Sequence, residues 1–175
     1  LTKNNNVTSV SQFKNVLSAL DRLTETNLIF TKANSDPNGL KINNMIKQFV
    51  KKNNKSRIAF DSMGYKLYFS ALKNVDCVIG NSSSGIIEAP SFKIPTINIG
   101  NRQKGREMAR SIINCKPLRD EILFSIKKSS DQAFQKVVKS ASNPYGSGKT
   151  TQKILKIIKN IDLNKIKFKK FFDLS

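Results

Sequence analysis

The chain has 175 residues, a length typical of a single domain with one hydrophobic core. Hydrophobic residues make up 38% and charged residues 25%, which excludes a disordered composition, and no apolar run approaches the roughly 20 residues that cross a bilayer. The 31 Lys and Arg against 12 Asp and Glu give a net charge of +19, which attracts polyanions of any kind.

Short apolar segments alternate with segments of helical periodicity along the chain. The first helix, at 13–20, follows Ser9 and Ser11, either of which is a candidate N-cap. In chain order we then expect a strand at 27–32, a helix at 42–50, a strand at 57–60, a helix at 65–75, a strand at 76–80, a short helix at 86–89, strands at 95–100 and 111–115, and helices at 118–128, 131–140 and 149–160.

This alternation predicts an α/β fold with a doubly wound parallel sheet, Rossmann-like in its βαβ units. We expect a nucleotide-binding domain at 1–162 and a basic, aromatic tail at 163–175. Ligands of such sheets bind at the carboxyl ends of the strands. That rule selects four loops, at 34–39, 61–64, 81–85 and 101–106.

The segment "GSGKTT" (Gly146 to Thr151) is similar to the end of an ATP-binding P-loop. A P-loop has a glycine five residues before its second glycine, and that position is Asn143 here. The preceding "AFQKVVKSAS" has a helical rather than a strand pattern. We therefore interpret the segment as a turn before the last helix, not as an ATP site.

A better candidate is the loop in "VIGNSSSGIIEAP", where a buried strand ends at Gly80 and a helix opens near Gly85. Backbone amides and serine hydroxyls at the start of a helix suit an anion, and the positive end of the helix helps. Glu88 is well placed to accept from the two hydroxyls of a ribose. The alternative is that the serines only cap the helix and that Glu88 is a surface residue.

The stretch from Gly80 to Arg106, "GNSSSGIIEAPSFKIPTINIGNRQKGR", resembles the signature of the UDP-N-acetylglucosamine 2-epimerase family. Weaker similarity extends to "FTKANSDPNG", "FDSMGYKLYFSALKN" and "NPYGSG". The resemblance implies one half of a two-domain, glycosyltransferase-B-like fold. This chain would be the carboxy-terminal half, with the amino-terminal domain lying outside it.

The resemblance also implies a UDP site. Ser82 and Ser83 would hold the diphosphate, Glu88 the ribose, and Arg102 would supply positive charge. The uracil would lie near Ser62, Met63 and Phe69, which follow the second predicted strand. The remaining position implied is Asn34, with Asn81, Ser84, Gly85, Gln103 and Arg106 as secondary contacts.

By the same resemblance, "SSSGIIEA" and "RQKGRE" are closer to the hydrolysing, sialic- or legionaminic-acid type of epimerase. Such an enzyme acts on UDP-N-acetylglucosamine or a related UDP-N-acetylhexosamine in the cytoplasm, as a homo-oligomer, without an organic cofactor. Histidine is absent and Cys77 and Cys115 are far apart, so we expect no metal site and two buried free thiols. We place no catalytic residue in this chain, and expect it alone to bind UDP without turnover.

Two alternatives stay open. A glycosyltransferase of the same architecture would use the same UDP pocket. A basic nucleic-acid-binding module would use the charge, but most lysines fall at solvent-facing helix positions, so we expect neither a nucleic-acid nor a membrane partner. For the tail "NKIKFKKFFDLS" (Asn164 to Ser175) we favour docking onto the amino-terminal domain over a membrane or RNA contact.

Overall fold

The computed structural model describes residues 8–33, 38–146 and 148–162. The chain divides into two compact units, Leu1–Pro144 and Tyr145–Ser175, and each is described by itself. The predicted tail at 163–175 and the predicted boundary before it lie at or outside the limit of the described residues, so that division stays a prediction.

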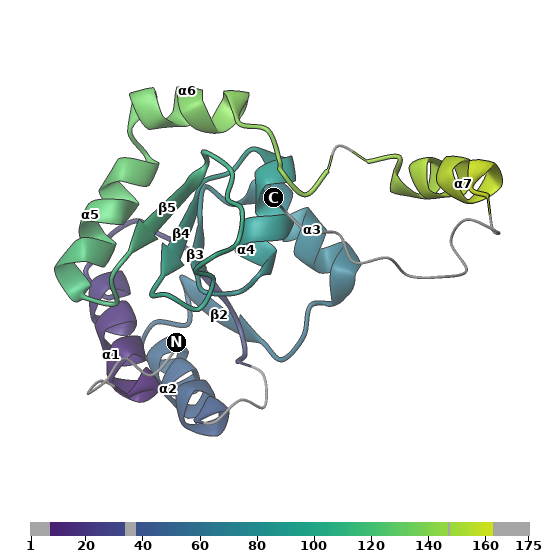
Figure 1. Ribbon diagram of the computed structural model, residues 1–175. Helices are drawn as coiled ribbons and strands as arrows, with labels where there is room; N and C mark the ends of the chain where they lie inside the picture. Colours follow the sequence, from purple (N-terminus) through teal and green to yellow (C-terminus); the bar gives the residue numbers. More distant parts are fainter. Residues whose placement is uncertain (1–7, 34–37, 147, 163–175) are drawn as a thin grey trace. The chain divides into compact units, whose positions relative to one another are not determined.

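All the expected elements of the first unit are present (Figure 1). In chain order they are α1 (Ser9–Leu20), β1 (Leu28–Thr31), α2 (Gly39–Lys52), β2 (Arg57–Phe60), α3 (Gly64–Asn74), β3 (Val78–Gly80), α4 (Ser84–Ile87), the 3-10 helix η1 (Ala89–Phe92), β4 (Thr96–Ile99), β5 (Ile112–Cys115), α5 (Arg119–Ser129) and α6 (Gln132–Ser140).

Two local predictions were wrong. Thr8, not Ser9 or Ser11, is the N-cap of α1, and its hydroxyl accepts from the backbone N–H of Ser11. The short helix expected at 86–89 begins earlier, at Ser84, and ends at Ile87. Pro90 has no N–H to continue an α-helix, so the chain tightens into η1 instead.

The strands pair in parallel, which confirms the predicted fold class. β1 pairs with β2, with Leu28 opposite Arg57, and β4 lies between β3 and β5, with Ile97 opposite both Ile79 and Ile113. Hydrogen bonds among the described residues therefore group the five strands into a two-stranded and a three-stranded sheet. All four residues of β4 are buried, as expected of a central parallel strand.

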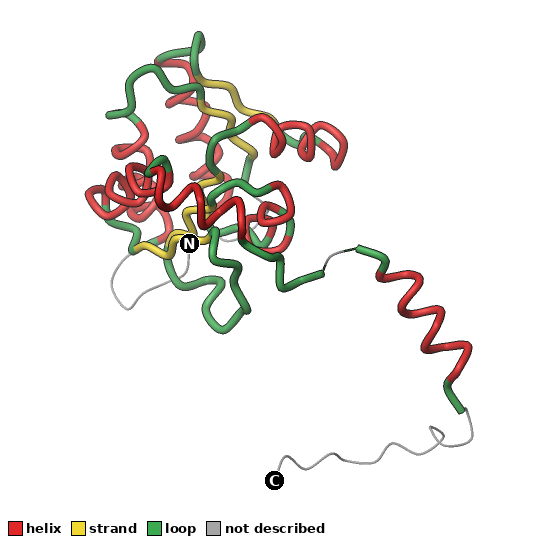
Figure 2. The backbone as a smooth tube through the Cα atoms, turned by 90° about the horizontal axis from the view of Figure 1, so that it is seen from above, coloured by secondary structure: helices red, strands yellow, loops and turns green. Residues whose placement is uncertain are grey.

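Helices cover both faces of the three-stranded sheet (Figures 1 and 2). On one face, α1 and α5 pack a core that includes Leu20, Ile97 and Ile122. On the other, α3, α4 and η1 pack a smaller cluster built on Leu72, Ala89 and Ile94. The doubly wound arrangement brings the ends of four strands to one edge.

The second unit contains α7 (Thr150–Asn160), none of whose described residues is buried. Its apolar positions, Ile154, Leu155, Ile157 and Ile158, are about half exposed, and lysines alternate with them. Across the described ranges, no helix combines the length and the apolar character needed to cross a membrane.

Candidate functional site

The loops that follow β1, β2, β3 and β4 enclose a cavity of about 780 Å³. This is the edge of the sheet at which parallel α/β folds bind ligands. Ten of the predicted site residues line it: Ser62, Met63, Phe69, Asn81, Ser82, Ser83, Glu88, Arg102, Gln103 and Arg106. Ser84 and Gly85 line a smaller neighbouring cavity, and Asn34 lies outside the described residues.

The three serines after β3 have different surroundings. Ser83 is the N-cap of α4 but its side chain makes no capping hydrogen bond, and Ser82 Oγ accepts only a long 3.4 Å bond from the Ser84 amide. Ser84 Oγ instead bonds the Tyr68 hydroxyl. Capping therefore does not account for Ser82 and Ser83, both of which line the larger cavity.

The helix α4 has only four residues, so its dipole adds little at this site. The expected contribution of a helix terminus to anion binding is therefore small here. Positive charge at the cavity comes from side chains instead, chiefly Arg102 and Arg106 in the exposed loop after β4. Guanidinium groups suit phosphate oxygens because they donate in pairs.

Glu88 is the C-cap of α4 and is half-buried in the cavity wall. It is therefore not a fully exposed surface residue, which was the alternative to a ligand-binding role. Its backbone joins α4, which packs against β3 and β4, to η1, which packs against α3 and α4, so the position of its Cα atom is fixed. A carboxylate can accept hydrogen bonds from two neighbouring hydroxyls at once.

Residues at and after the start of α3 also line the cavity. Met63 is half-buried, while Ser62 is exposed and its hydroxyl accepts a 3.4 Å bond from the Gly64 amide. Phe69 is 37% exposed and lines the cavity, with its ring centroid 5.5 Å from that of Phe92. It is thus neither a core residue nor free of packing, since the two rings are in tilted contact at an interplanar angle of 51°.

Tyr68 also lines the cavity, a position that sequence reasoning missed. Burial raises the pKa of its hydroxyl; the bond to Ser84 offsets this in part, and the charge of Glu88 adds to it. The group stays protonated at neutral pH and links α3 to the serine loop through Ser84. Tyr68 and Phe69 are adjacent aromatic residues of one helix. From the sequence, Phe69 was named as the site residue and Tyr68 was not.

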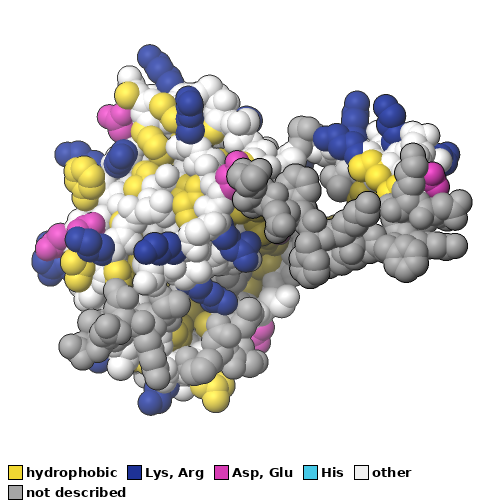
Figure 3. Space-filling view, in the orientation of Figure 1, with side chains coloured by type: hydrophobic (Ala, Val, Ile, Leu, Met, Phe, Trp, Pro, Cys, Tyr) yellow, Lys and Arg dark blue, Asp and Glu magenta, His cyan; other side chains and the backbone are white. Residues whose placement is uncertain are grey.

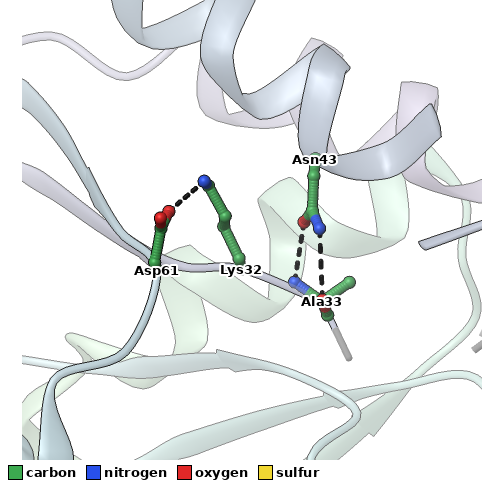
Figure 4. Close-up of polar contacts among 4 residues, drawn as sticks. All are labelled: Lys32, Ala33, Asn43 and Asp61. Atoms are coloured by element: carbon green, nitrogen blue, oxygen red, sulfur yellow. Dashed lines mark hydrogen bonds and ion pairs between the residues drawn. The ribbon is translucent and has the colours of Figure 1, made fainter. Parts of the chain in front are cut away.

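Lys32 and Asp61 were missed as well (Figure 4). They follow β1 and β2, form an ion pair across the two strands, and line the cavity. Lys32 holds the pKa of the Asp61 carboxyl below its usual range, so the pair persists at neutral pH. Asp61 belongs to the loop at 61–64 that the strand-end rule selected, although it was not named as a site residue. Lys32 was placed inside the predicted strand at 27–32, whereas β1 ends one residue before it.

Asn43 of α2 fixes the same corner of the site. Its side-chain oxygen accepts from the Ala33 amide at 2.8 Å and its nitrogen donates to the Ala33 carbonyl at 3.2 Å (Figure 4). The Asn43 side chain therefore bonds both the N–H and the C=O of Ala33, just after β1. This anchors the chain where it enters the loop that contains Asn34.

Comparison with known proteins decides the family. A family described as UDP-N-acetylglucosamine 2-epimerase matches residues 2–159. The chain belongs to the UDP-N-acetylglucosamine 2-epimerase family. It is 42% identical over 164 residues to the hydrolysing GDP/UDP-N,N'-diacetylbacillosamine 2-epimerase of Campylobacter jejuni, covering 93% of this chain and 42% of that protein.

Two further epimerase-family comparisons agree. The hydrolysing UDP-N,N'-diacetylbacillosamine 2-epimerase of Legionella pneumophila is 33% identical, over 87% of this chain and 39% of its own length. A solved structure of S. aureus MnaA with UDP superposes with a TM-score of 0.67 at 20% identity, over 90% of this chain and 42% of the other. The chain thus spans about two fifths of the length of these relatives, and its fold is one half of their glycosyltransferase-B-like fold.

The segment that is similar to a P-loop has the context expected of a turn. The helix α6, not a strand, precedes it, and Lys149 is the left-handed N-cap residue of α7, with φ at 61°. A strand that ends in a phosphate-binding turn is therefore not present at this point of the described chain. The residues that line the 780 Å³ cavity all belong to the first unit, whereas this segment belongs to the second.

Proposed function

We propose that this chain binds the uridine diphosphate part of a nucleoside diphosphate 2-acetamido sugar, as the nucleotide-binding half of a hydrolysing 2-epimerase. One observation carries the proposal: a single cavity of about 780 Å³ collects hydroxyl, carboxylate, guanidinium and aromatic groups from four strand-end loops. Each kind of group matches one part of such a ligand. Membership of the epimerase family supports the same ligand class.

In this proposal Ser82 and Ser83 donate to the diphosphate, and Arg102 and Arg106 neutralise its charge. Glu88 accepts from both ribose hydroxyls. The base lies against Phe69, which is itself in tilted contact with Phe92, with Met63 and Ser62 beside it. Asn34 remains a proposed ligand contact on the loop after β1.

The proposed reaction removes the proton from C2 of the sugar and breaks the bond from C1 to the diphosphate oxygen, so that UDP leaves and a glycal forms. Water then adds across the C1–C2 double bond and releases the free 2-epimer, N-acetylmannosamine or its diacetamido counterpart. An acid–base group must lie within hydrogen-bond reach of the proton. We propose that those groups lie outside this chain, which contains no histidine and supplies binding rather than proton transfer.

The named relatives support a hydrolysing reaction on an acetamido sugar nucleotide, and we propose a place in sialic- or legionaminic-type sugar synthesis.

We propose a cytoplasmic location. Both cysteines are free, and burial raises the pKa of the Cys77 thiol to about 11, so this group stays protonated at neutral pH. Free thiols of this kind are typical of a reducing compartment.

Glu88→Gln tests the proposed site because it removes a charge while keeping the side chain's size. The parent chain should prefer UDP to 2'-deoxy-UDP, and Glu88→Gln should weaken UDP binding about tenfold and narrow that preference. Titration calorimetry measures both affinities. Glu121→Gln is the matched control: it removes an acid on α5 that is paired with Lys116, and it should change neither the UDP affinity nor the preference over 2'-deoxy-UDP.

An unchanged affinity for UDP in Glu88→Gln would contradict the assignment. So would an equal loss for UDP and 2'-deoxy-UDP, since the ribose hydroxyls would then play no part.

A further inference from the structure

The parallel strands form one layer that is interrupted between β1 and β3. Among the described residues β1 pairs only with β2, and β3 pairs only with β4, so each is an edge strand of its own sheet. Both strands nevertheless pack on one hydrophobic cluster, to which β1 contributes Leu28 and Phe30 and β3 contributes Ile79. The carboxyl ends of both also reach the 780 Å³ cavity, so the two sheets have the same orientation.

The edge of β1 that faces away from β2 is open. In a parallel pair, alternate residues bond the same neighbour, and the residues between them turn their N–H and C=O groups to the other side. The amides of Leu28 and Lys32 donate to carbonyls of the β2 segment at 56–60, at 2.8 and 3.1 Å. Ile29 and Thr31, which lie between them, therefore turn their backbone groups away from β2.

The facing edge of β3 is open in the same way. The amide of Val78 donates to the Pro95 carbonyl just before β4, at 3.0 Å, so Cys77 and Ile79 turn their backbone groups away from β4. These two residues and the two outward residues of β1 line a common, mainly apolar cavity of about 220 Å³. Two edges with free N–H and C=O groups are a template for a further strand.

Side chains beside the interruption are less covered than those of a strand with two neighbours. All four residues of β4, which lies between β3 and β5, are buried. Ile29 of β1 is 47% exposed, and all three residues of β3 are only half-buried. Inner strands of parallel sheets are normally apolar and covered on both faces, so this exposure indicates that a neighbour is absent.

The packing of α1 indicates where that neighbour comes from. α1 leads into β1, yet the cluster that it packs on includes Ile97 and Ile99 of β4. A crossover helix covers the two parallel strands that it connects, so a strand that enters α1 lies beside β1 on the side of β3. Residues 1–7 contain three Asn, one Thr and one Lys and lack the apolar pattern of such a strand.

We propose that an apolar strand from the part of the protein that precedes residue 1 inserts between β1 and β3, parallel to both, and joins the two sheets into one. The relatives contain enough further chain to supply it, since this chain spans about two fifths of their length. The carboxyl end of the inserted strand lies between the loops after β1 and β3 and completes the wall of the 780 Å³ cavity there. The strand is needed whatever ligand that cavity binds.

Amide exchange of the 175-residue chain, read residue by residue by NMR, tests the open edges first. The amides of Ile29, Thr31 and Ile79 should exchange about tenfold or more faster than those of Leu28 and Val78, which have partners in the β2 segment and before β4. Equal protection of all five would show that the edges are already paired and would overturn the proposal.

The chain is then extended before residue 1 by the segment of about 12 residues that precedes the matched region of the Campylobacter jejuni relative, enough for a strand and its turn. This extension should slow exchange at Ile29, Thr31 and Ile79 about tenfold or more and raise the melting temperature. A Gly-Ser extension of the same length is the control and should do neither. Unchanged exchange with the apolar extension would also overturn the proposal.

Ile29→Pro removes an N–H that faces the inserted strand and leaves the bonds to β2 in place. Ala59→Pro is the matched control, because by the same alternation the Ala59 amide lies on the outer edge of β2. The apolar extension should raise the melting temperature of Ala59→Pro but not of Ile29→Pro. An equal rise in both variants would show that the extension stabilises the chain without pairing with β1.

UDP affinity, measured on the same proteins, keeps the two proposals apart. Binding of UDP by the parent chain without any effect of the extension on amide exchange would overturn the inserted strand and leave the proposed function standing.

Discussion

Gly85 sets the distance between α4 and β4. A Cβ atom at this position would come 2.8 Å from Thr96 Cγ2, closer than real Cβ atoms approach other atoms. Thr96 is 2% exposed in a fully buried strand, so it cannot move away. The segment Ser82–Ser84 can therefore approach β4 this closely because the next residue, Gly85, has no side chain.

Gly85→Ala should lower the free energy of unfolding by about 1–3 kcal/mol through overpacking. Thr96→Ala removes the opposing methyl group, so the double variant should recover most of that loss. Urea denaturation of the four proteins in a double-mutant cycle measures the coupling. Strictly additive effects would show that the two residues do not touch.

The sequence predicted individual site residues where a motif gave them a place along the chain. Ser82, Ser83 and Glu88 belong to one short segment, and the structure places all three on one cavity. Tyr68 could not be found in this way, because its role depends on a hydroxyl contact with Ser84, 16 residues away. A contact of that kind is a product of tertiary packing and leaves no local pattern.

At the level of elements, the segment after α6 is fastened to the site. The side-chain nitrogen of Asn143 donates to the Ile87 carbonyl at 2.8 Å and to Ser91 Oγ at 2.7 Å. Lys93, which follows η1, also bonds the Ala141 carbonyl. These bonds hold the junction of α4 and η1 from behind, and that junction contains Glu88.

Asn143→Ala should therefore weaken nucleotide binding although Asn143 does not line the cavity. Losing two hydrogen bonds and leaving the part-buried Ile87 carbonyl unpaired should cost about 1 kcal/mol of stability, and a displaced Glu88 should reduce UDP affinity severalfold. Asn74→Ala, which removes a side-chain bond to the Ser70 carbonyl on α3, is the control. Lower stability with unchanged UDP affinity would show that the hydrogen bonds of Asn143 do not position Glu88 for binding.

Most elements were predictable because local sequence decides them. The apolar segments at 57–60 and 96–99 are short and bounded by polar or turn residues, and both are strands. The grouping of the strands into two hydrogen-bonded sheets was not predictable, since strand pairing depends on contacts between distant segments. The break between α4 and η1 depends on one proline, Pro90, that follows a helix of only four residues.

For the whole molecule, the net charge of +19 is the property that most needs an explanation. On the face shown in Figure 3, the described Lys and Arg side chains are scattered among acidic, apolar and other polar ones. This pattern is that of a solvated surface rather than of a continuous nucleic-acid-binding stripe. Three basic residues line the cavity; Lys32 is paired with Asp61, and Arg102 and Arg106 are those proposed to neutralise the diphosphate.

The central claim is that the cavity at the strand ends is a UDP site. Its most direct test is a calorimetric titration of the chain with UDP, UMP and ATP, each at low and at moderate salt. We predict that UDP binds best, because the diphosphate and uracil are both recognised, and that the preference survives added salt. Equal binding of all three nucleotides, lost steeply as salt rises, would contradict it and show a general affinity of a basic surface for anions.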